Sequence, residues 1–372
     1  MTKRYSPQEM LARLVGFETV TGQPNTALMD FVRDYLQAHG VTVHLLPGPE
    51  GDRSNLFATI GDADRAGHIL SGHVDVVPTG EPEWRGNPFH LREEEDRLIA
   101  RGACDMKGFV AAVLSAVPDL VSMQLGSPIH IALSYDEEAG CRGVPHMIAA
   151  LPSLCATPAG CIVGEPTGLV PVLAHKGKAA LRLMARGRSG HSSRPDLGAN
   201  AIHALLPALQ AAAAQARALR QGPQDERFAP PWSSMQIGTL SGGQAVNIIP
   251  DWAEAEIEAR AIAGIEPRDL LAPVIAAADE TVKVEWLSSY PALALDAGHP
   301  LVALMTGISG NDPLGAVSFG TEAGLFQTAG IPSIVCGPGD IARAHRPEEY
   351  LTRGELRAAS DMVLALGRNL AA

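Results

Sequence analysis

Histidine and acidic residues recur at or just beyond the ends of four short apolar segments of the sequence. They are His73 and Asp75 after residues 68–72, Asp136, Glu137 and Glu138 after 129–134, Glu165 after 160–163, and His345 after 333–336. Imidazole and carboxylate groups are donors that zinc, cobalt and manganese accept, and no thiolate is among them. If the four segments are strands of one sheet, their ends could bring together the donors for a pair of divalent ions.

Asp105 extends this donor set. It stands at the start of an apolar segment, residues 105–117, whose pattern predicts a helix. Aspartate is common at that position as a helix cap, so this residue alone does not indicate a ligand. As a ligand, its two oxygens could bridge two metals, which lie ~3.5–4 Å apart in paired sites. Each residue by itself could have an ordinary structural role, and the joint pattern carries the hypothesis.

Two carboxylates could assist the chemistry without binding metal. Asp75 lies two residues after His73, so both side chains lie on one face of an extended segment. Asp75 could therefore accept the second ring N–H of His73. Glu137 and Glu138 are adjacent and point in different directions in an extended chain. One could bind a metal while the other takes a proton from water, whose pKa a metal lowers toward ~7.

The order of the predicted elements explains how these residues would meet. Ser6, Pro7 and Glu9 have the pattern of a helix start, with a capping box and a proline in the first turn. Strands and helices then alternate, which indicates an α/β fold with a mostly parallel mixed sheet flanked by helices. In open sheets of this kind, ligands bind beyond the carboxyl ends of the strands.

Residues 178–287 have a different pattern. Strands in this segment alternate apolar and polar residues, and an alanine-rich helix covers about residues 200–220. This is typical of an antiparallel sheet with helices on one face. We therefore expect a catalytic metal-binding domain from residues 1–177 and 288–372, and an inserted α+β domain from residues 178–287.

The composition argues against several classes of protein. The net charge of −12 argues against nucleic acid as a partner, because phosphate binding needs basic surfaces. The longest apolar stretch, Phe109–Val117, is shorter than the ~18–20 residues that span a bilayer, so no membrane association is expected. The first residues lack the apolar region of a secretory signal. Five cysteines are an odd number without framework spacing, so a reduced, cytoplasmic protein is expected.

Six segments resemble the co-catalytic zinc aminoacylase and carboxypeptidase family, and they occur in the family's order. They are SGHVDVVP (71–78), GACDMKG (102–108), SYDEEAG (134–140), GEPTG (164–168), SGHSSRP (189–195) and GPGDIARAHRPEEYL (337–351). The resemblance covers essentially the whole chain. It implies an enzyme with two divalent metal ions per chain, expected to be zinc, with cobalt or manganese able to substitute.

The resemblance also implies a role for each candidate metal ligand. His73, Asp105 and Glu165 would hold one ion. Asp105, Glu138 and His345 would hold the other, so that Asp105 bridges the two ions. In the family, the peptide bond that follows the bridging aspartate is often cis, which is rare for a residue other than proline.

Three further residues would take part in the reaction. By the same resemblance, Glu137 matches the general base and Asp75 matches the carboxylate that orients a ligand. His191 matches a histidine of the inserted domain that reaches the partner subunit's active site in the family's homodimers and helps to hold the oxyanion. The inserted domain would then be a dimerisation and lid domain. His191 could equally belong to a capped turn before a helix.

Positions that contact the substrate are implied as well. Asn247 and Arg260 match residues that bind a substrate carboxylate, although the family more often has Asp-x-Arg where this chain has Glu-x-Arg. Thr321 and Glu322 resemble the branch of the family that acts on N-acetyl-L-ornithine. Glu322 could pair with a cationic substrate side chain, or it could be a solvated loop residue.

Together these features predict an amidohydrolase that cleaves a linear amide in a small N-acyl amino acid. The expected reaction releases acetate and L-ornithine from N-acetyl-L-ornithine, a step of arginine biosynthesis. The alternatives are deacylation of another N-acyl amino acid, of succinyl-diaminopimelate or of a dipeptide on the same scaffold. A non-catalytic metal-binding relative would be expected to lack a ligand or the base, and this chain has all six.

Overall fold

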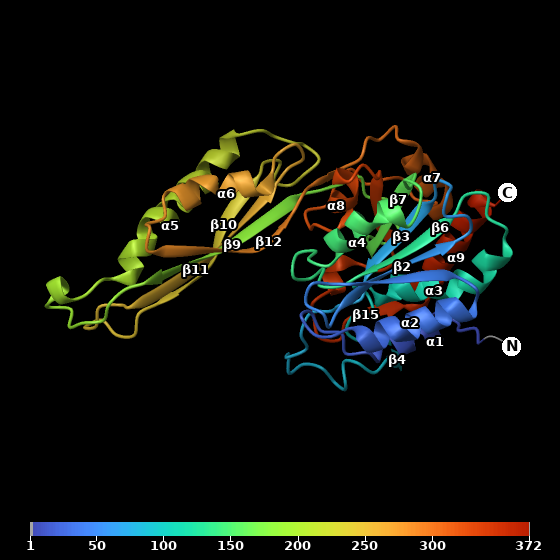
Figure 1. Ribbon diagram of the computed structural model, residues 1–372, viewed down its shortest axis with the longest axis horizontal. Coiled ribbons are helices and arrows are strands. Elements are labelled where there is room, and N and C mark those ends of the chain that lie inside the picture. The colour runs from blue at the N-terminus through green and yellow to red at the C-terminus, as the bar shows by residue number, and fades with distance from the viewer. Residues whose placement is uncertain (1–2, 372) are drawn as a thin grey trace. The chain divides into compact units, whose positions relative to one another are not determined.

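The chain divides into two compact units (Figure 1). A computed structural model describes residues 3–371. Within this range, the first unit extends to Leu173 and resumes over Leu295–Gly315 and from Thr321 onward, and the second unit consists of Ala174–Ala294 and Ala316–Gly320. The second unit is longer than the 178–287 insertion expected from the sequence. One reason is that β8 (Ala174–His175) pairs with β13 (Leu293–Ala294) within it.

The first unit is built on a sheet with the strand order β1-β2-β6-β3-β7-β14. These strands are β1 (Thr42–Pro47), β2 (Ser54–Ile60), β3 (His68–His73), β6 (Ile129–Ser134), β7 (Gly160–Pro166) and β14 (Ser333–Gly337). β6, β3, β7 and β14 run parallel to one another, whereas β1 and β2 pair antiparallel. The predicted mostly parallel mixed sheet is therefore confirmed.

Helices flank this sheet (Figure 1). They are α1 (Pro7–Val15), α2 (Thr26–Ala38), α3 (Lys107–Ser122), α4 (Val144–Ala150), α7 (Pro300–Ser309), α8 (Ala323–Thr328) and α9 (Arg353–Leu370). Helices α1, α2, α3 and α9 share one hydrophobic core with the strands, while α4 and α8 pack against each other and against β2, β7 and β14. A smaller antiparallel sheet contains β4 (Arg92–Glu94), β5 (Arg97–Ile99) and β15 (Tyr350–Thr352).

Local sequence signals set where two of these helices begin. At α1 the predicted capping box is present, because Ser6 Oγ accepts the N–H of Glu9 while the Glu9 carboxylate accepts the N–H of Ser6. Thr352 and Glu355 form the same box at the start of α9. These reciprocal bonds satisfy backbone donors that a helix start leaves unpaired.

The start of α3 differs from the prediction. The helix begins at Lys107, and Met106 occupies the cap position without a side-chain hydrogen bond. Asp105 is therefore not the helix cap, and its carboxylate is available for other contacts. The Asp105–Met106 peptide bond is cis, as the family resemblance implied. Gly164 in β7 lets α3 pack closely, because a Cβ at this position would lie 2.0 Å from the ring of Phe109.

The second unit is an antiparallel sheet with the strand order β10-β11-β9-β12. Its strands are β9 (Gly177–Arg186), β10 (Ser234–Gly242), β11 (Trp252–Ala261) and β12 (Val282–Tyr290), and its helices are α5 (Ala201–Ala218) and α6 (Pro267–Ala276). Alternate residues of β11 are buried with α5 and α6, so both helices cover one face of the sheet (Figure 1). This confirms the predicted inserted α+β architecture. No helix of residues 3–371 is both long and apolar enough to cross a bilayer.

Candidate metal centre

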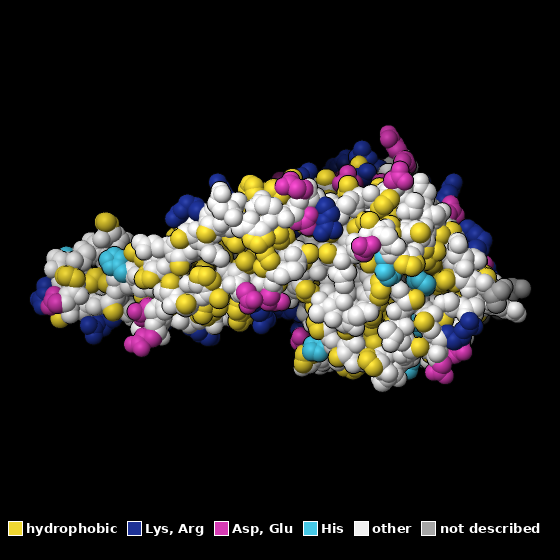
Figure 2. All heavy atoms as spheres, turned by 90° about the horizontal axis from the view of Figure 1, so that it is seen from above, with side chains coloured by type: hydrophobic (Ala, Val, Ile, Leu, Met, Phe, Trp, Pro, Cys, Tyr) yellow, Lys and Arg dark blue, Asp and Glu magenta, His cyan; other side chains and the backbone are white. Residues whose placement is uncertain are grey.

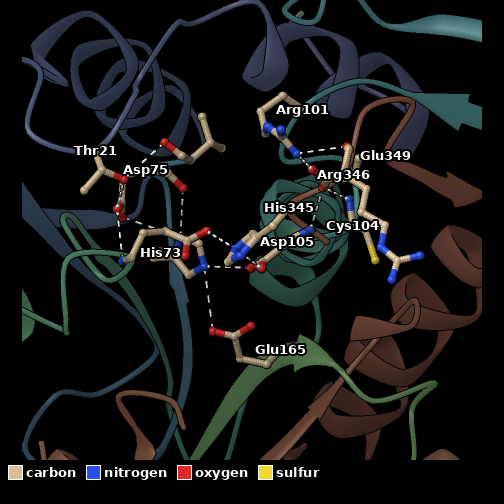
Figure 3. Close-up of polar contacts among 12 residues, drawn as sticks. Thr21, His73, Asp75, Arg101, Cys104, Asp105, Glu165, His345, Arg346 and Glu349 are labelled. Carbon is tan, nitrogen blue, oxygen red and sulfur yellow. Dashed lines mark hydrogen bonds and ion pairs between the residues drawn. The ribbon is translucent and has the colours of Figure 1, made fainter. Parts of the chain in front are cut away.

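Three neighbouring strands and one helix bring predicted donors together. Strand β3 lies between β6 and β7, and the three run parallel, so their carboxyl ends meet at one edge. His73 is the last residue of β3, Glu165 lies near the end of β7, and Glu138 follows β6. Asp105 precedes α3, which packs against β3 and β7. Figure 3 shows His73, Asp105, Glu165 and His345 pointing toward one another.

Asp105 lies between two histidines. Its Oδ1 is 3.0 Å from Nε2 of His73, and its Oδ2 is 3.3 Å from Nε2 of His345. Glu165 Oε1 lies 3.7 Å from Nε2 of His73, and Glu138 Oε1 lies 2.9 Å from Nε2 of His345. Each histidine therefore faces Asp105 and one glutamate. The result is two adjacent groups of donors that share a single carboxylate.

The ring of His73 is oriented by the chain two residues further on. Its Nδ1 lies 2.9 Å from the backbone carbonyl of Asp75 and 3.5 Å from Oδ1 of the same residue. The backbone carbonyl is thus the nearer acceptor for the Nδ1–H of His73. This bond directs Nε2 toward Asp105 and Glu165, as is common for histidines that bind metal.

The carboxylate of Asp75 instead holds the chain that follows β6. Its Oδ1 accepts the N–H of Glu137 at 3.1 Å, and its Oδ2 accepts the N–H of Glu138 at 3.3 Å. The hydroxyl of Thr21 also donates to Oδ2, at 3.0 Å (Figure 3). Asp75 therefore fixes the backbone of both glutamates relative to His73.

The acids of the cluster strongly favour a positive charge between them. Hydrogen bonds to Asp105 and Glu138 raise the pKa of His345 to about 10. Burial lowers the pKa of His73, but its hydrogen bonds to Asp105 and Asp75 outweigh this and raise the pKa well above its ordinary value. Burial raises the pKa of Glu165 well above that of an exposed glutamate. The histidine shifts reflect the negative charge around them, and the Glu165 shift reflects the cost of burying a carboxylate without a cation nearby.

The donor set fits divalent metal ions. Among the described residues, two groups place their donor atoms within 4.8 Å of one another: His73 with Glu137 and Glu165, and His73 with Asp105 and Glu138. Grouping carboxylates in a largely buried site is unfavourable without compensating positive charge. Two divalent ions would supply that charge, and imidazole and carboxylate are suitable donors. Glu137 also lies within reach, so distance alone does not separate a base from a ligand.

His345 reaches the cluster from an unusual backbone conformation. It follows a short 3₁₀ turn, Ile341–Arg343, and has a φ of +58°. This left-handed region is uncommon for residues other than glycine and often marks functional positions. Half of the His345 side chain is exposed. The site is therefore open to solvent on the side of this histidine.

Residues 69–369 match the model of peptidase family M20/M25/M40. The chain belongs to this family. The acetylornithine deacetylase of Proteus mirabilis (strain HI4320) is 33% identical over 358 residues, which cover 94% of this chain and 91% of that protein. The acetylornithine deacetylase of Myxococcus xanthus is 34% identical over 359 residues, which cover 92% of this chain and 91% of that protein.

Solved structures of the family share this fold. The metallo-carboxypeptidase Sso-CP2 of Sulfolobus solfataricus superposes with a TM-score of 0.81 at 18% identity and covers 98% of this chain and 99% of its own. Human carnosine dipeptidase 1 superposes with a TM-score of 0.73 at 16% identity and covers 97% of this chain and 96% of its own. At these identities the likeness concerns the fold.

Three residues predicted to act at the site belong to the second unit. His191 is exposed, and its Nδ1 lies 2.7 Å from the hydroxyl of Ser193. Asn247 is exposed in the loop between β10 and β11. Arg260 is half-buried on β11 and donates to the carboxylate of Glu258 and to the hydroxyl of Tyr290.

Thr321 and Glu322 lie in the first unit and are both buried. Thr321 Oγ1 accepts the N–H of Ala323 at the start of α8. Glu322 is 1% exposed, so the interpretation as a solvated loop residue is wrong. Its two oxygens accept hydrogen bonds from Ser71 at 2.5 Å and from Ser134 at 2.7 Å. Glu322 therefore links the adjacent strands β3 and β6 just before the residues that they deliver to the site.

Two acidic residues of the quoted segments have contacts that the sequence did not predict. Asp136 forms an ion pair with Arg53 at 2.6 Å and accepts the N–H of Gly22 at 2.8 Å, which anchors the turn before Glu137. Glu349 accepts the backbone N–H groups of Cys104 and Asp105. Their supporting roles could not be predicted, because their partners are far away in the sequence.

The Asp75 contacts give a testable prediction. Asp75→Asn replaces one acceptor oxygen by a donor that faces an N–H group, so the backbone of Glu137 and Glu138 loses a support. We expect the affinity for Zn²⁺ to fall by about 10–100-fold. Calorimetric titration of chelator-stripped protein measures this affinity, with the exposed Asp64→Asn as the control. An affinity equal to that of the unchanged protein would show that Asp75 does not support the site.

Proposed function

We propose that this protein is a di-metal amidohydrolase that converts N-acetyl-L-ornithine into L-ornithine and acetate. The observation that carries the proposal is the carboxylate of Asp105, whose two oxygens face His73 and His345 within a cluster of acids. Metal-dependent amide hydrolysis agrees with membership of the family. The substrate is supported by relatives named acetylornithine deacetylase at 33% and 34% identity. Formation of L-ornithine would place the reaction in arginine biosynthesis.

The proposed metal ligands are the donors that gather around each of the two histidines, with Asp105 shared between them. We assign His73, Asp105 and Glu165 to one ion, and Asp105, Glu138 and His345 to the other. When bound, the ions polarise the amide carbonyl and acidify a water molecule. We expect zinc, and cobalt or manganese could replace it because histidine and carboxylate donors accept all three.

Glu137 is the proposed general base. Desolvation and the nearby carboxylates of Glu138 and Asp75 raise the pKa of Glu137 to about 8, which makes it a stronger base than an exposed glutamate. Its backbone is held by Asp75, and its Oε1 accepts a hydrogen bond from the thiol of Cys141 at 3.2 Å. Glu137 would take a proton from water and deliver it to the nitrogen of the leaving amine.

Three residues of the second unit are proposed to bind substrate or oxyanion. His191 is exposed and so is accessible to a second chain. One hydrogen-bond donor to a developing oxyanion contributes ~3–4 kcal/mol in other hydrolases, and His191 could be such a donor. Arg260 offers a guanidinium for the substrate carboxylate, with Asn247 as a further donor. Thr321 and Glu322 are left out of the proposed substrate contacts, because both are buried and bonded within the protein.

The surface of the second unit supports a homodimer. Strand β10 is at the edge of its sheet, and edge strands can pair with another chain. Ile237 and Leu240 on this strand and Leu206 on α5 are exposed, as is Val246 in the following loop. Figure 2 shows hydrophobic side chains on the surface of this unit. A pocket of about 690 Å³ is lined by Val246, by the residues 242–245 before it and by Ser192, next to His191. The proposed occupant is a second copy of this chain.

Removal of the base is the first test of the mechanism. Glu137→Gln keeps the size of the side chain but cannot accept a proton, so we expect kcat to fall by about 10²–10⁴-fold while metal content stays unchanged. Metal analysis and steady-state kinetics on N-acetyl-L-ornithine measure both quantities. The exposed Glu226→Gln is the matched control. Near-normal turnover by Glu137→Gln would end the assignment of the base.

A substrate panel tests the proposed specificity. We expect kcat/KM to be highest for N-acetyl-L-ornithine, and lower for succinyl-diaminopimelate, N-acetyl-methionine and a dipeptide. The measurement uses protein loaded with zinc or cobalt. A higher kcat/KM for another member of the panel would contradict the proposed substrate but not the proposed amidohydrolase activity.

The dimer gives a separate prediction. Leu240→Asp places a charge on the exposed edge strand, so we expect the protein to sediment as a monomer and its kcat to fall with the loss of His191 from the partner's site. Val121→Asp changes an exposed apolar residue of the first unit and is the control. Analytical ultracentrifugation and kinetics on the same samples decide the matter. A fully active monomer would contradict the role of His191 in trans.

A further inference from the structure

Beneath the candidate metal centre lies a buried ion pair between Arg101 and Glu349. Both residues are 1% exposed, and Arg101 Nη1 lies 3.0 Å from Glu349 Oε2. Neither residue was singled out by the sequence, and neither is among the proposed ligands. A buried pair of this kind is costly to desolvate and weak evidence for stability by itself. The role of the Arg101–Glu349 pair therefore depends on the other contacts that the two residues make.

Glu349 holds the backbone of the bridging carboxylate. Its Oε1 accepts the N–H of Asp105 at 3.0 Å and the N–H of Cys104 at 2.9 Å. Its Oε2 is taken by Arg101, so both oxygens are bonded within the protein. Figure 3 shows Glu349 beside Arg101 and Cys104. Glu349 thus fixes the main chain from which Asp105 extends.

Arg101 connects this anchor to the other side of the site. Its Nη1 also donates to the backbone carbonyl of Arg346, at 3.2 Å, and Arg346 follows His345 directly (Figure 3). Its Nη2 donates to Glu81 at 2.9 Å and lies 3.4 Å from the carbonyl of Pro78. One guanidinium therefore joins the segment that carries Asp105 to the loop that carries His345. Both of these contacts come from Nη1, while the contacts of Nη2 with Glu81 and Pro78 hold the planar guanidinium in place.

We propose that Arg101 and Glu349 are positioning residues that set the separation between Asp105 and His345 for the second metal ion. His73 and Glu165 are held by strands β3 and β7, whereas His345 lies on a loop. The ion assigned to Asp105, Glu138 and His345 depends on this pair more than the other ion does. This proposal rests on the proposed metal centre. It adds that two residues outside the ligand set control the affinity for one of the two metal ions.

The test uses full-length, chelator-stripped protein titrated with Zn²⁺ in a calorimeter. Glu349→Gln retains an acceptor for the two N–H groups but removes the charge that holds Arg101. We expect one of the two binding steps to lose about 10–100-fold in affinity while the other is unchanged. Arg101→Met, which removes the donors to Glu349 and to the carbonyl of Arg346, should give the same selective loss and serves if Glu349→Gln does not fold.

Glu81→Gln is the matched control, because it makes the same chemical change on the same arginine but touches neither ligand segment. It should leave both affinities unchanged. Circular dichroism of the metal-free variants shows that each is folded. Two unchanged affinities in Glu349→Gln and Arg101→Met, or an equal loss in both steps, would overturn the inference. If the unchanged protein itself binds fewer than two ions, the proposed metal centre fails instead.

Discussion

Carboxylates that are gathered in a largely buried site repel one another unless positive charge lies between them. This constraint organises the first unit of the protein. Asp105 stands at its centre, with one oxygen toward His73 and the other toward His345. Glu165 and Glu138 complete the two sides. Protonated histidines compensate part of this negative charge, and two divalent ions would compensate more of it.

The donors are held in place in different ways. His73 and Glu165 are fixed by adjacent parallel strands, which are rigid and buried. The glutamates after β6 are held through their backbone by Asp75. Asp105 is held from behind by Glu349. The site is therefore most rigid on the strand side and depends on side-chain networks on the loop side, where His345 is half exposed.

Much of this arrangement could be read from the sequence. Short apolar segments followed by His73, Glu138 or Glu165 predicted the parallel strands. They also predicted the edge where the donors meet, because the carboxyl ends of parallel strands lie at the same edge of a sheet. The cap at Ser6 could be predicted because its partner, Glu9, is only three residues away. The helix start at Lys107 was missed by two residues, because Asp105 is a residue type that often caps helices, whereas Met106 occupies the cap position.

The hydrogen bonds and ion pairs that support the site could not be predicted. Arg101 and Glu349 are 248 residues apart in the sequence, and Ser71 and Glu322 are 251 apart. Glu322 was expected to face substrate or solvent, yet it is buried between two serines. Nothing in local composition distinguishes a glutamate that will be buried from one that stays at the surface. Only the packing of distant segments determines which carboxylates find a donor.

Asp105 is proposed to bridge two metal ions. Crystals grown with zinc, with diffraction recorded on both sides of the zinc absorption edge, would show this bridge. Two anomalous peaks per chain are expected, ~3.5–4 Å apart, each within ~2.0–2.2 Å of a different oxygen of Asp105. A single peak, or two peaks of which either lies away from Asp105, would rule out the bridge.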